Sequence, residues 1–180
     1  MQRRIFLVGP MGAGKSAVGR QLARLLGWPF EDADAWIETR TGVDIPYIFE
    51  REGESGFRKR EHAAIETLTL QKPLVLATGG GVVMDPDNRR LLAERGIVVY
   101  LQATVAQQLA RVSHSNNRPL LKTGDPEAIL TRLFEMRDPL YREIADLTVT
   151  TDNQRVPTVA RHVAIQLREQ YDIDHEPSCS

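Results

Sequence analysis

Hydrophobic residues near the N-terminus form first a short continuous run and then a helical stripe. The run Arg4 to Val8 (RIFLV) has the nearly continuous apolar character of a strand that is buried on both faces of a parallel sheet. Apolar residues then recur at helical spacing from Val18 to Leu26, and Gly27 is placed to end that helix. The pattern predicts that the chain opens with a strand, a loop and a helix.

Further strands are predicted along the rest of the chain. They have short apolar runs bounded by turn or cap signals, and they cover Trp28 to Ala33, Leu74 to Thr78, Ile97 to Leu101 and Leu147 to Thr150. Helical patterns separate them, and this alternation favours an α/β fold. Right-handed crossovers then place helices on both faces of the sheet. We predict a three-layer fold around a five-stranded parallel sheet, with ligands at the carboxyl ends of the strands.

Two segments depart from this alternation. The stretch Arg111 to Asp125 is rich in Ser, Asn, Gly and Pro and also contains basic residues, which is typical of a mobile loop of functional length. The tail after Tyr171 is polar and is expected to fray. We find no internal repeat or linker, so we expect one domain over residues 1–171, with a lid at about 112–125 and a disordered tail at 172–180.

Composition and charge narrow the classes of protein. The chain has 180 residues, 42% of them hydrophobic, and a formal net charge of −1, so it offers one core and no overall basic field for nucleic acid or membrane. The single cysteine, Cys179, suits a reducing cytoplasm. The N-terminal run is too short for a signal peptide, and no segment reaches the ~18 apolar residues that span a bilayer. We expect a cytoplasmic monomer without nucleic-acid or membrane partners.

A phosphate-binding loop is predicted between the first strand and the first helix. Gly9 to Ser16 (GPMGAGKS) matches G-x-x-x-x-G-K-[ST], and the glycines let backbone N–H groups turn towards phosphate oxygens at a helix N-terminus. Lys15 is expected to contact the β- and γ-phosphates of ATP, and the Ser16 hydroxyl to ligate Mg²⁺. The alternative is a glycine-rich turn that only caps the helix. Such a turn would not need the preceding strand, the motif spacing and the following helix to occur together.

Two carboxylates follow the second predicted strand. Asp32 and Asp34 are two residues apart, so in an extended segment both side chains project to the same side. Beside Mg²⁺-ATP, Asp32 is suited to the metal shell and Asp34 to the acceptor hydroxyl. A solvated strand end or a helix cap is the alternative.

A charged pair is predicted to face inward on a helix that opens at Gly56. Arg58 and Glu61 are in phase with the apolar positions Ile65 and Leu68. Glu61 can hold the guanidinium in one orientation, which leaves its fork free for the carboxylate of a ligand. A surface ion pair is the alternative.

A glycine run and a second inward arginine complete the candidates for an acceptor site. Thr78 to Gly81 (TGGG) follows the third apolar strand and permits close backbone approach to a ligand, although a plain turn can have the same sequence. Arg137 shares the apolar stripe of its helix with Leu130, Phe134 and Tyr141. An inward arginine needs an anion, from a ligand or from a core carboxylate, unless its side chain snorkels outward.

Taken together, the motifs resemble shikimate kinases in order and spacing. The set consists of the phosphate loop, D-A-D at 32–34, F-R-x-x-E at 57–61, T-G-G-G at 78–81, N-R-P-L-L at 117–121 and R-D-P-L-Y at 137–141. It covers nearly the whole chain, to about Leu167. The resemblance implies transfer of phosphate from ATP, with Mg²⁺, to the 3-hydroxyl of shikimate, a step of chorismate and aromatic amino-acid biosynthesis.

The resemblance also implies roles for individual residues. Those implied for the nucleotide are Gly12, Ala13, Gly14, Lys15, Ser16, Ala17, Arg111, Arg118, Arg155 and Pro157. Those implied for shikimate are Asp34, Phe49, Phe57, Arg58, Gly79, Gly80, Gly81 and Arg137. Ser16 and Asp32 would hold the metal, and Lys15, Asp34 and the lid residue Arg118 would be catalytic. The two phenylalanines can equally be core residues, and Arg155 with Pro157 can be a turn before the last helix.

Two rival functions remain. Another small P-loop kinase, acting on gluconate or a nucleoside monophosphate, would share the loop, lid and sheet; a nucleotide acceptor would need base recognition that we do not locate. A binding module that senses nucleotide or shikimate without turnover would be a different class. The presence of Lys15, Ser16, Asp32 and Asp34 together argues against it.

Overall fold

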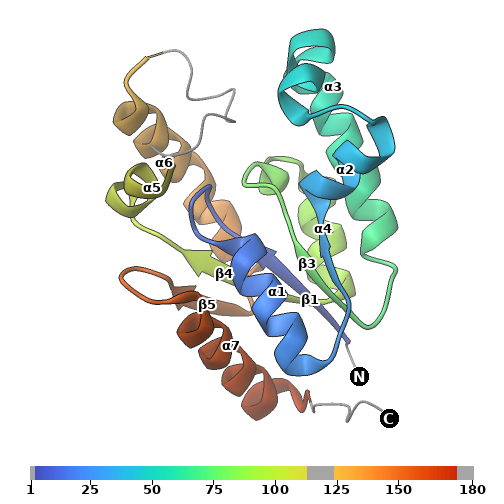
Figure 1. Ribbon diagram of the computed structural model, residues 1–180, viewed down its shortest axis with the longest axis vertical. Coiled ribbons are helices and arrows are strands. Elements are labelled where there is room, and N and C mark those ends of the chain that lie inside the picture. The colour runs from blue at the N-terminus through green and yellow to red at the C-terminus, as the bar shows by residue number, and fades with distance from the viewer. Residues whose placement is uncertain (1–2, 113–123, 174–180) are drawn as a thin grey trace.

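Five parallel strands form a single sheet in the order β2-β3-β1-β4-β5. The computed structural model describes residues 3–112 and 124–173. The strands are β1 (Arg4–Val8), β2 (Phe30–Asp32), β3 (Leu74–Ala77), β4 (Ile97–Gln102) and β5 (Leu147–Thr150). The predicted α/β fold with a five-stranded parallel sheet is confirmed, and β1 lies at its centre (Figure 1).

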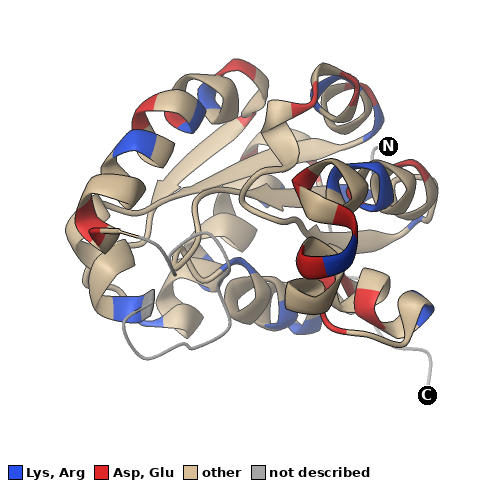
Figure 2. Cartoon of the chain, turned by 90° about the horizontal axis from the view of Figure 1, so that it is seen from above, with Lys and Arg blue, Asp and Glu red and all other residues tan. Residues whose placement is uncertain are grey.

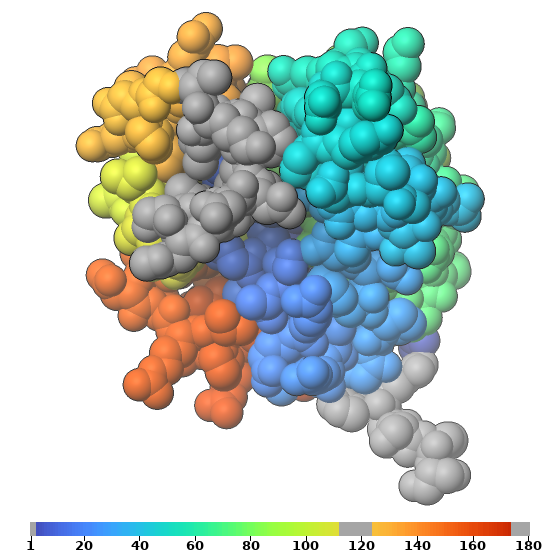
Figure 3. Space-filling view, turned by 45° about the horizontal axis from the view of Figure 1, so that its top comes forward, coloured from blue at the N-terminus to red at the C-terminus, as the bar shows by residue number. Residues whose placement is uncertain are grey.

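Helices cover both faces of the sheet and make the three predicted layers (Figure 1). Their bounds are α1 (Lys15–Leu26), α2 (Ala33–Thr41), α3 (Ile45–Leu68), the 3₁₀ turn η1 (Val82–Met84), α4 (Pro86–Arg95), α5 (Val105–Val112), α6 (Pro126–Ile144) and α7 (Val156–Tyr171). Helices α1 and α7 pack on one face, and α3, α4 and α6 on the other. In Figure 3 α3 lies at the upper right, α5 and α6 at the upper left, and α1 below.

The continuous apolar run of β1 is explained by the two cores that it separates. Ile5 and Leu7 belong to the core under α1 and α7. Phe6 and Val8 belong to the core on the opposite face. Since successive strand side chains point to opposite faces, a strand between two helical layers needs apolar residues at every position. All four side chains are completely buried.

The second strand is shorter than predicted because a helix begins inside the expected range. Asp32 ends β2 and caps α2, so that Ala33, which we expected in the strand, is the first helical residue. Trp28 precedes the strand and packs in the first core. The expectation that Asp32 and Asp34 share one extended segment is therefore wrong, since Asp34 lies in the first turn of α2.

The helix predicted to open at Gly56 begins eleven residues earlier, at Ile45. Asp44 caps it, its side chain accepting a hydrogen bond from the N–H of Tyr47 at 2.9 Å. The helix is broken at Gly53, whose φ of 69° and ψ of −178° are not helical. The inward phase of Arg58 and Glu61 that the sequence predicted belongs to the half of α3 after this break.

At the start of the predicted lid and of the predicted disordered tail, helical or packed structure continues further along the chain than the sequence indicated. Arg111 and Val112, expected in the loop or lid, form the last turn of α5. Ile173, expected in the tail, packs in the first core, so the packed chain continues past Tyr171. The remainder of the predicted lid, residues 113–123, and the tail from 174 lie outside the described residues.

Charges of both signs lie side by side on the helices (Figure 2), in keeping with the formal net charge of −1. Within the described residues, no helix is both long and apolar enough to cross a membrane.

Candidate active site

The phosphate loop joins the end of β1 to the start of α1. Its glycines at 9, 12 and 14 have positive φ values of 146°, 79° and 86°, a region that other residues rarely adopt. A Cβ on Gly9 would in addition collide with the carbonyl oxygen of Leu101 in β4. The backbone of the loop therefore favours glycine at all three positions, of which Gly9 and Gly14 are those that the motif specifies.

A cavity of about 380 Å³ opens over this loop. It is lined by Met11, Gly12, Gly14, Lys15, Ser16, Ala17, Arg20, Asp32, Asp34, Thr78, Gly79, Gly80 and Arg111. The structure thus brings together three motifs that are far apart in the sequence: the phosphate loop, D-A-D and T-G-G-G. They meet because β1, β3 and β2 are neighbours whose carboxyl ends lie at one edge of the sheet.

Lys15 is held against its own loop. Its ammonium group donates to the carbonyl oxygens of Gly9 at 2.8 Å and Pro10 at 2.9 Å. These contacts keep the positive charge at the helix N-terminus, where an incoming phosphate is also favoured by the helix dipole.

Ser16 and Asp32 form the pair that a metal ion would need. The Ser16 hydroxyl donates a short hydrogen bond to Oδ2 of Asp32, while Oδ1 accepts from the N–H groups of Asp34 at 3.1 Å and Ala35 at 3.3 Å. Asp32 is therefore both a helix cap and the partner of Ser16. Among the described residues no cluster of three or more metal-binding side chains occurs. One hydroxyl and one carboxylate fit Mg²⁺ whose shell is completed by phosphates and water.

Asp34 lies in an environment that disfavours its charge. Burial above all, together with the nearby carboxylates of Asp32 and Glu61, raises its pKa from 3.8 to about 7, whereas the positive charge of Lys15 opposes the shift. Its Oδ1 is buried without a hydrogen-bond partner. A carboxyl group with a pKa near neutrality and an open acceptor position is suited to hold a hydroxyl and accept its proton.

Arg58 is held by two carboxylates of its own helix. Its Nη1 donates to Oε2 of Glu61 at 2.7 Å, and its Nη2 donates to Oε1 of Glu54 at 3.0 Å. The Glu61 side chain is only 1% exposed, and burial raises its pKa although Arg58 and Arg137 oppose the shift. The expectation that Glu61 orients Arg58 is met, but the guanidinium is not otherwise free as expected, because its Nη2 already donates one hydrogen bond to Glu54.

The glycine run is required by these side chains. A Cβ on Gly79 would lie 2.6 Å from Oε1 of Glu61, and a Cβ on Gly81 would collide with the guanidinium of Arg58. The strand end therefore passes so close to the charged pair that a side chain at Gly79 or Gly81 would fit only if the Glu61 or Arg58 side chain moved. This contact explains a glycine-rich sequence that we had considered equally compatible with a plain turn.

Arg137 is buried on the inward face of α6, as its position on the apolar stripe predicted. It is 6% exposed, its Nε is buried without a hydrogen-bond partner, and a Cβ on Gly80 would lie 3.7 Å from its Nη1. Arg58 and Arg137 both line a cleft of about 600 Å³ between α3 and α6. The two arginines thus meet in space from separate helices.

Tyr141, one turn after Arg137, ties α6 to the glycine run. Its hydroxyl donates a short hydrogen bond to the carbonyl oxygen of Gly80. Its ring stacks on that of Tyr100 with centroids 4.9 Å apart, and the Tyr100 hydroxyl donates to Asp138 at 2.7 Å. The sequence placed Tyr141 on the apolar stripe and in the R-D-P-L-Y motif but did not show this hydrogen bond, because its partner lies 61 residues away.

Of the residues expected around the nucleotide base, Arg111 lies beside the phosphate loop, whereas Arg155 and Pro157 lie at the start of α7. Arg111 donates to the carbonyl oxygens of Gly12 at 2.6 Å and Thr151 at 3.2 Å, so it ties the phosphate loop to the segment after β5. Thr151, a buried residue that the sequence did not single out, thus supports the loop. Arg155 caps α7 and Pro157 lies in its first turn, an arrangement that a simple helix start also explains.

The remaining predicted residues differ in their surroundings. Phe57 belongs to the second core and Phe49 packs against that core, with their ring centroids 4.9 Å apart. This position agrees with the core role that we kept open for them. Arg118 lies outside the described residues.

A phosphate loop that faces an arginine-lined cleft across one sheet edge is the arrangement of a small-molecule P-loop kinase. The family model described as shikimate kinase matches residues 11–168 of the chain. The chain belongs to the shikimate kinase family, a family of phosphotransferases.

Individual relatives agree with this family. A shikimate kinase from Halorhodospira halophila is 59% identical over 167 residues, which cover 93% of this chain and 94% of that one. A shikimate kinase from Vibrio parahaemolyticus is 53% identical over 94% of this chain and 98% of its own. The solved structure of an Acinetobacter baumannii shikimate kinase in complex with shikimate has a TM-score of 0.90 and 50% identity, covering 93% of this chain and 94% of that chain.

We predict that Tyr141→Phe weakens the use of shikimate. Without the hydroxyl, the carbonyl of Gly80 loses its donor and the glycine run is less firmly held beside Arg137. Since one hydrogen bond contributes roughly 0.5–1.5 kcal/mol, KM for shikimate should rise about two- to tenfold, with KM for ATP unchanged. Steady-state kinetics with each substrate varied in turn measures both values.

Tyr100→Phe is the matched control for this variant. It removes a hydroxyl from the ring stacked on Tyr141, but that hydroxyl bonds to Asp138 and not to the glycine run. Its KM for shikimate should remain that of the wild type. Equal increases in both variants would show a general loss of packing and would contradict the positioning role of Tyr141.

Proposed function

We propose that the chain transfers the γ-phosphate of ATP to the 3-hydroxyl of shikimate at the sheet edge between the cavity over the phosphate loop and the cleft lined by Arg58 and Arg137. The observation that supports this site is the position of the glycine run. Gly79 and Gly80 line the cavity over the phosphate loop, and Gly81 lies against Arg58 of the neighbouring cleft. An acceptor whose carboxylate is bound in the cleft would thus present a ring hydroxyl to Asp34.

On the donor side, we assign the phosphates to the backbone of Gly12 to Ala17 and to the ammonium group of Lys15. Ser16 and Asp32 would hold Mg²⁺, which neutralises charge on the phosphates when it is bound. Arg111 would lie near adenine and keep the loop in place through Gly12. The roles of Arg155 and Pro157 at the base, and of Arg118 in a lid over the phosphates, rest on the family resemblance.

On the acceptor side, we assign the carboxylate of shikimate to Arg58 and Arg137. Two guanidinium groups from different helices fix the plane of a carboxylate and hence the orientation of the ring. The backbone of Gly79 to Gly81 would approach the ring, with Phe57 and Phe49 supporting the wall of the pocket. Asp34 would then align the reacting hydroxyl and accept its proton, leaving a neutral carboxyl group as the phosphate ester forms.

We further infer a single domain that acts as a monomer in the cytoplasm, without nucleic-acid or membrane partners. The net charge of −1 and the mixed signs on the helices support the absence of nucleic-acid and membrane partners, since they provide no overall basic field.

The direct test is acceptor-dependent formation of ADP. Purified protein with Mg²⁺-ATP is given shikimate, gluconate or nucleoside monophosphates in a coupled assay. We expect ADP formation only with shikimate, because only this acceptor combines a carboxylate for the arginines with a ring hydroxyl for Asp34. ADP formation with another acceptor alone, or with none required, would contradict the proposal.

The raised pKa of Asp34 predicts an effect of pH on the stability of the ligand-free protein. The folded protein binds this proton more tightly than the unfolded chain, so the stabilisation is complete below pH about 4 and is lost as pH rises through about 7. Asp34→Asn has no such proton. Its free energy of unfolding, from urea titrations at pH 5 and pH 8, should therefore exceed that of the wild type by more at pH 8, on the order of 2–4 kcal/mol.

The same substitution should abolish transfer while the protein remains folded, which separates the chemical role of Asp34 from its effect on stability. If the wild type and the variant lose equal stability between pH 5 and pH 8, then Asp34 does not titrate in that range and its assignment as proton acceptor is wrong.

If the paired arginines bind the acceptor carboxylate, removing one of them should lower the affinity for the acceptor and leave the affinity for ATP unchanged. Arg137→Ala should weaken shikimate binding by ~2–4 kcal/mol, the scale for truncating one side of a buried charge pair, while ATP affinity stays near that of the wild type. Arg137→Lys should restore little, because lysine lacks the planar fork that grips a carboxylate at two points. Calorimetric titrations with shikimate and with Mg²⁺-ATP measure the two affinities.

Arg132→Ala provides the control in the same cleft. Arg132 lines the cleft but is exposed, so its loss should change shikimate affinity less than about threefold. Wild-type shikimate binding by Arg137→Ala would exclude Arg137 from the carboxylate site.

A further inference from the structure

The two carboxylates that hold Arg58 differ in their surroundings. Glu61 is buried and grips Nη1, whereas Glu54 is 55% exposed at its side chain and bonds to Nη2. Glu54 lines the same cleft as Arg58 and Arg137. One nitrogen of the guanidinium that would bind an acceptor carboxylate therefore already donates to a carboxylate of the protein itself.

The local backbone explains how Glu54 reaches this position. Gly53 interrupts α3 with its positive φ, and Glu54 is the first residue after the interruption. From there it lies one turn before Arg58, and a glutamate four residues before a basic residue is the favourable order for an ion pair along a helix. The break thus aligns Glu54 with Arg58 independently of the first half of α3.

We propose that Glu54 is an internal competitor for the acceptor carboxylate, and that it lowers the affinity of the site for shikimate and its phosphorylated product. This inference rests on the proposed function, because it assigns the acceptor carboxylate to Arg58. The bound acid displaces Glu54 from Nη2, and Glu54 returns when the product leaves.

The strengths of the two contacts allow such an exchange. An exposed ion pair contributes roughly 0–1 kcal/mol, so its loss costs little. A ligand carboxylate that meets both Arg58 and the buried Arg137 makes more numerous and less solvated contacts. Glu61 keeps hold of Nη1 throughout, so the guanidinium does not lose its orientation when Glu54 leaves.

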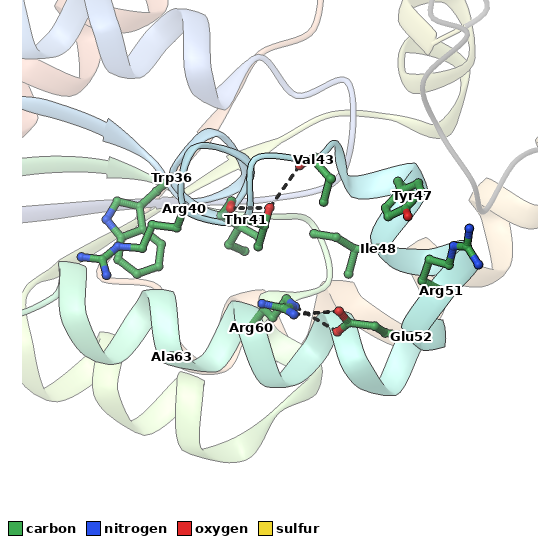
Figure 4. Close-up of a pocket in the computed structure, with 11 residues that line it drawn as sticks. Trp36, Arg40, Thr41, Val43, Tyr47, Ile48, Arg51, Glu52, Arg60 and Ala63 are labelled. Carbon is green, nitrogen blue, oxygen red and sulfur yellow. Dashed lines mark hydrogen bonds and ion pairs between the residues drawn. The ribbon is translucent and has the colours of Figure 1, made fainter.

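The test compares Glu54→Gln with Glu52→Gln. Glu52 is a matched control, since it is an exposed residue of the same helix whose carboxylate also holds an arginine, Arg60, at 2.9 and 2.7 Å. This second pair lines a groove between α2 and α3 on a different set of residues (Figure 4). Both substitutions remove one negative charge, but only Glu54→Gln removes the competitor.

We expect Glu54→Gln to bind shikimate about three- to tenfold more tightly than the wild type, a change of the size of one exposed ion pair. Glu52→Gln should change shikimate affinity less than about twofold, and neither substitution should change the affinity for Mg²⁺-ATP. Calorimetric titration and KM for shikimate provide independent measurements. The carboxamide analogue of shikimate, which has no carboxylate to compete, should gain nothing from Glu54→Gln.

The outcomes separate this inference from the proposed function. Absence of shikimate-dependent ADP formation by the wild type would refute the function itself. If the wild type is active but Glu54→Gln binds shikimate equally or more weakly, then Glu54 is no competitor. A similar gain in Glu52→Gln, or with the carboxamide, would reveal a general charge effect and would also overturn the proposal.

Discussion

The buried carboxylate of Glu61 is the interaction on which the site depends. It is 1% exposed, accepts a hydrogen bond from Arg58, lowers the cost of burying Arg137 and raises the pKa of Asp34. An unpaired charge in such a place would cost several kcal/mol, so the arginines are as necessary to Glu61 as Glu61 is to them. The glycine run lets the strand end pass this cluster without displacing the Glu61 and Arg58 side chains.

This cluster also explains why the site is poised for an anionic ligand. Arg137 has a buried Nε without a hydrogen-bond partner among the described residues, and in the cleft Arg58 is paired with the exposed Glu54. Both arginines therefore retain bonding capacity that a ligand carboxylate can use. Glu54 takes up part of the hydrogen-bonding capacity of Arg58. This contact helps to orient the guanidinium and, under our proposal, lowers the affinity of the site for the ligand carboxylate.

The donor side depends on its ligand in the same way. Ser16 and Asp32 bond to each other, and Lys15 bonds to the carbonyl groups of its own loop. Each of these polar groups thus has a partner that ATP and its metal ion would replace. Since phosphoryl transfer requires mainly positioning and charge stabilisation, a site whose polar groups are already held by the protein needs little reorganisation.

The sequence by itself determined the elements that follow from local pattern. Apolar periodicity predicted the five strands and the inward phase of Arg58 and Arg137, and the phosphate loop was recognisable because its glycines and lysine are contiguous. Only the tertiary structure showed that Arg58 donates a hydrogen bond to Glu54, that Asp34 lies in the first turn of a helix, and that Tyr141 bonds to Gly80. The physical reason is that periodicity reports which face of an element is buried, whereas a partner depends on how separate elements pack and on single breaks such as Gly53.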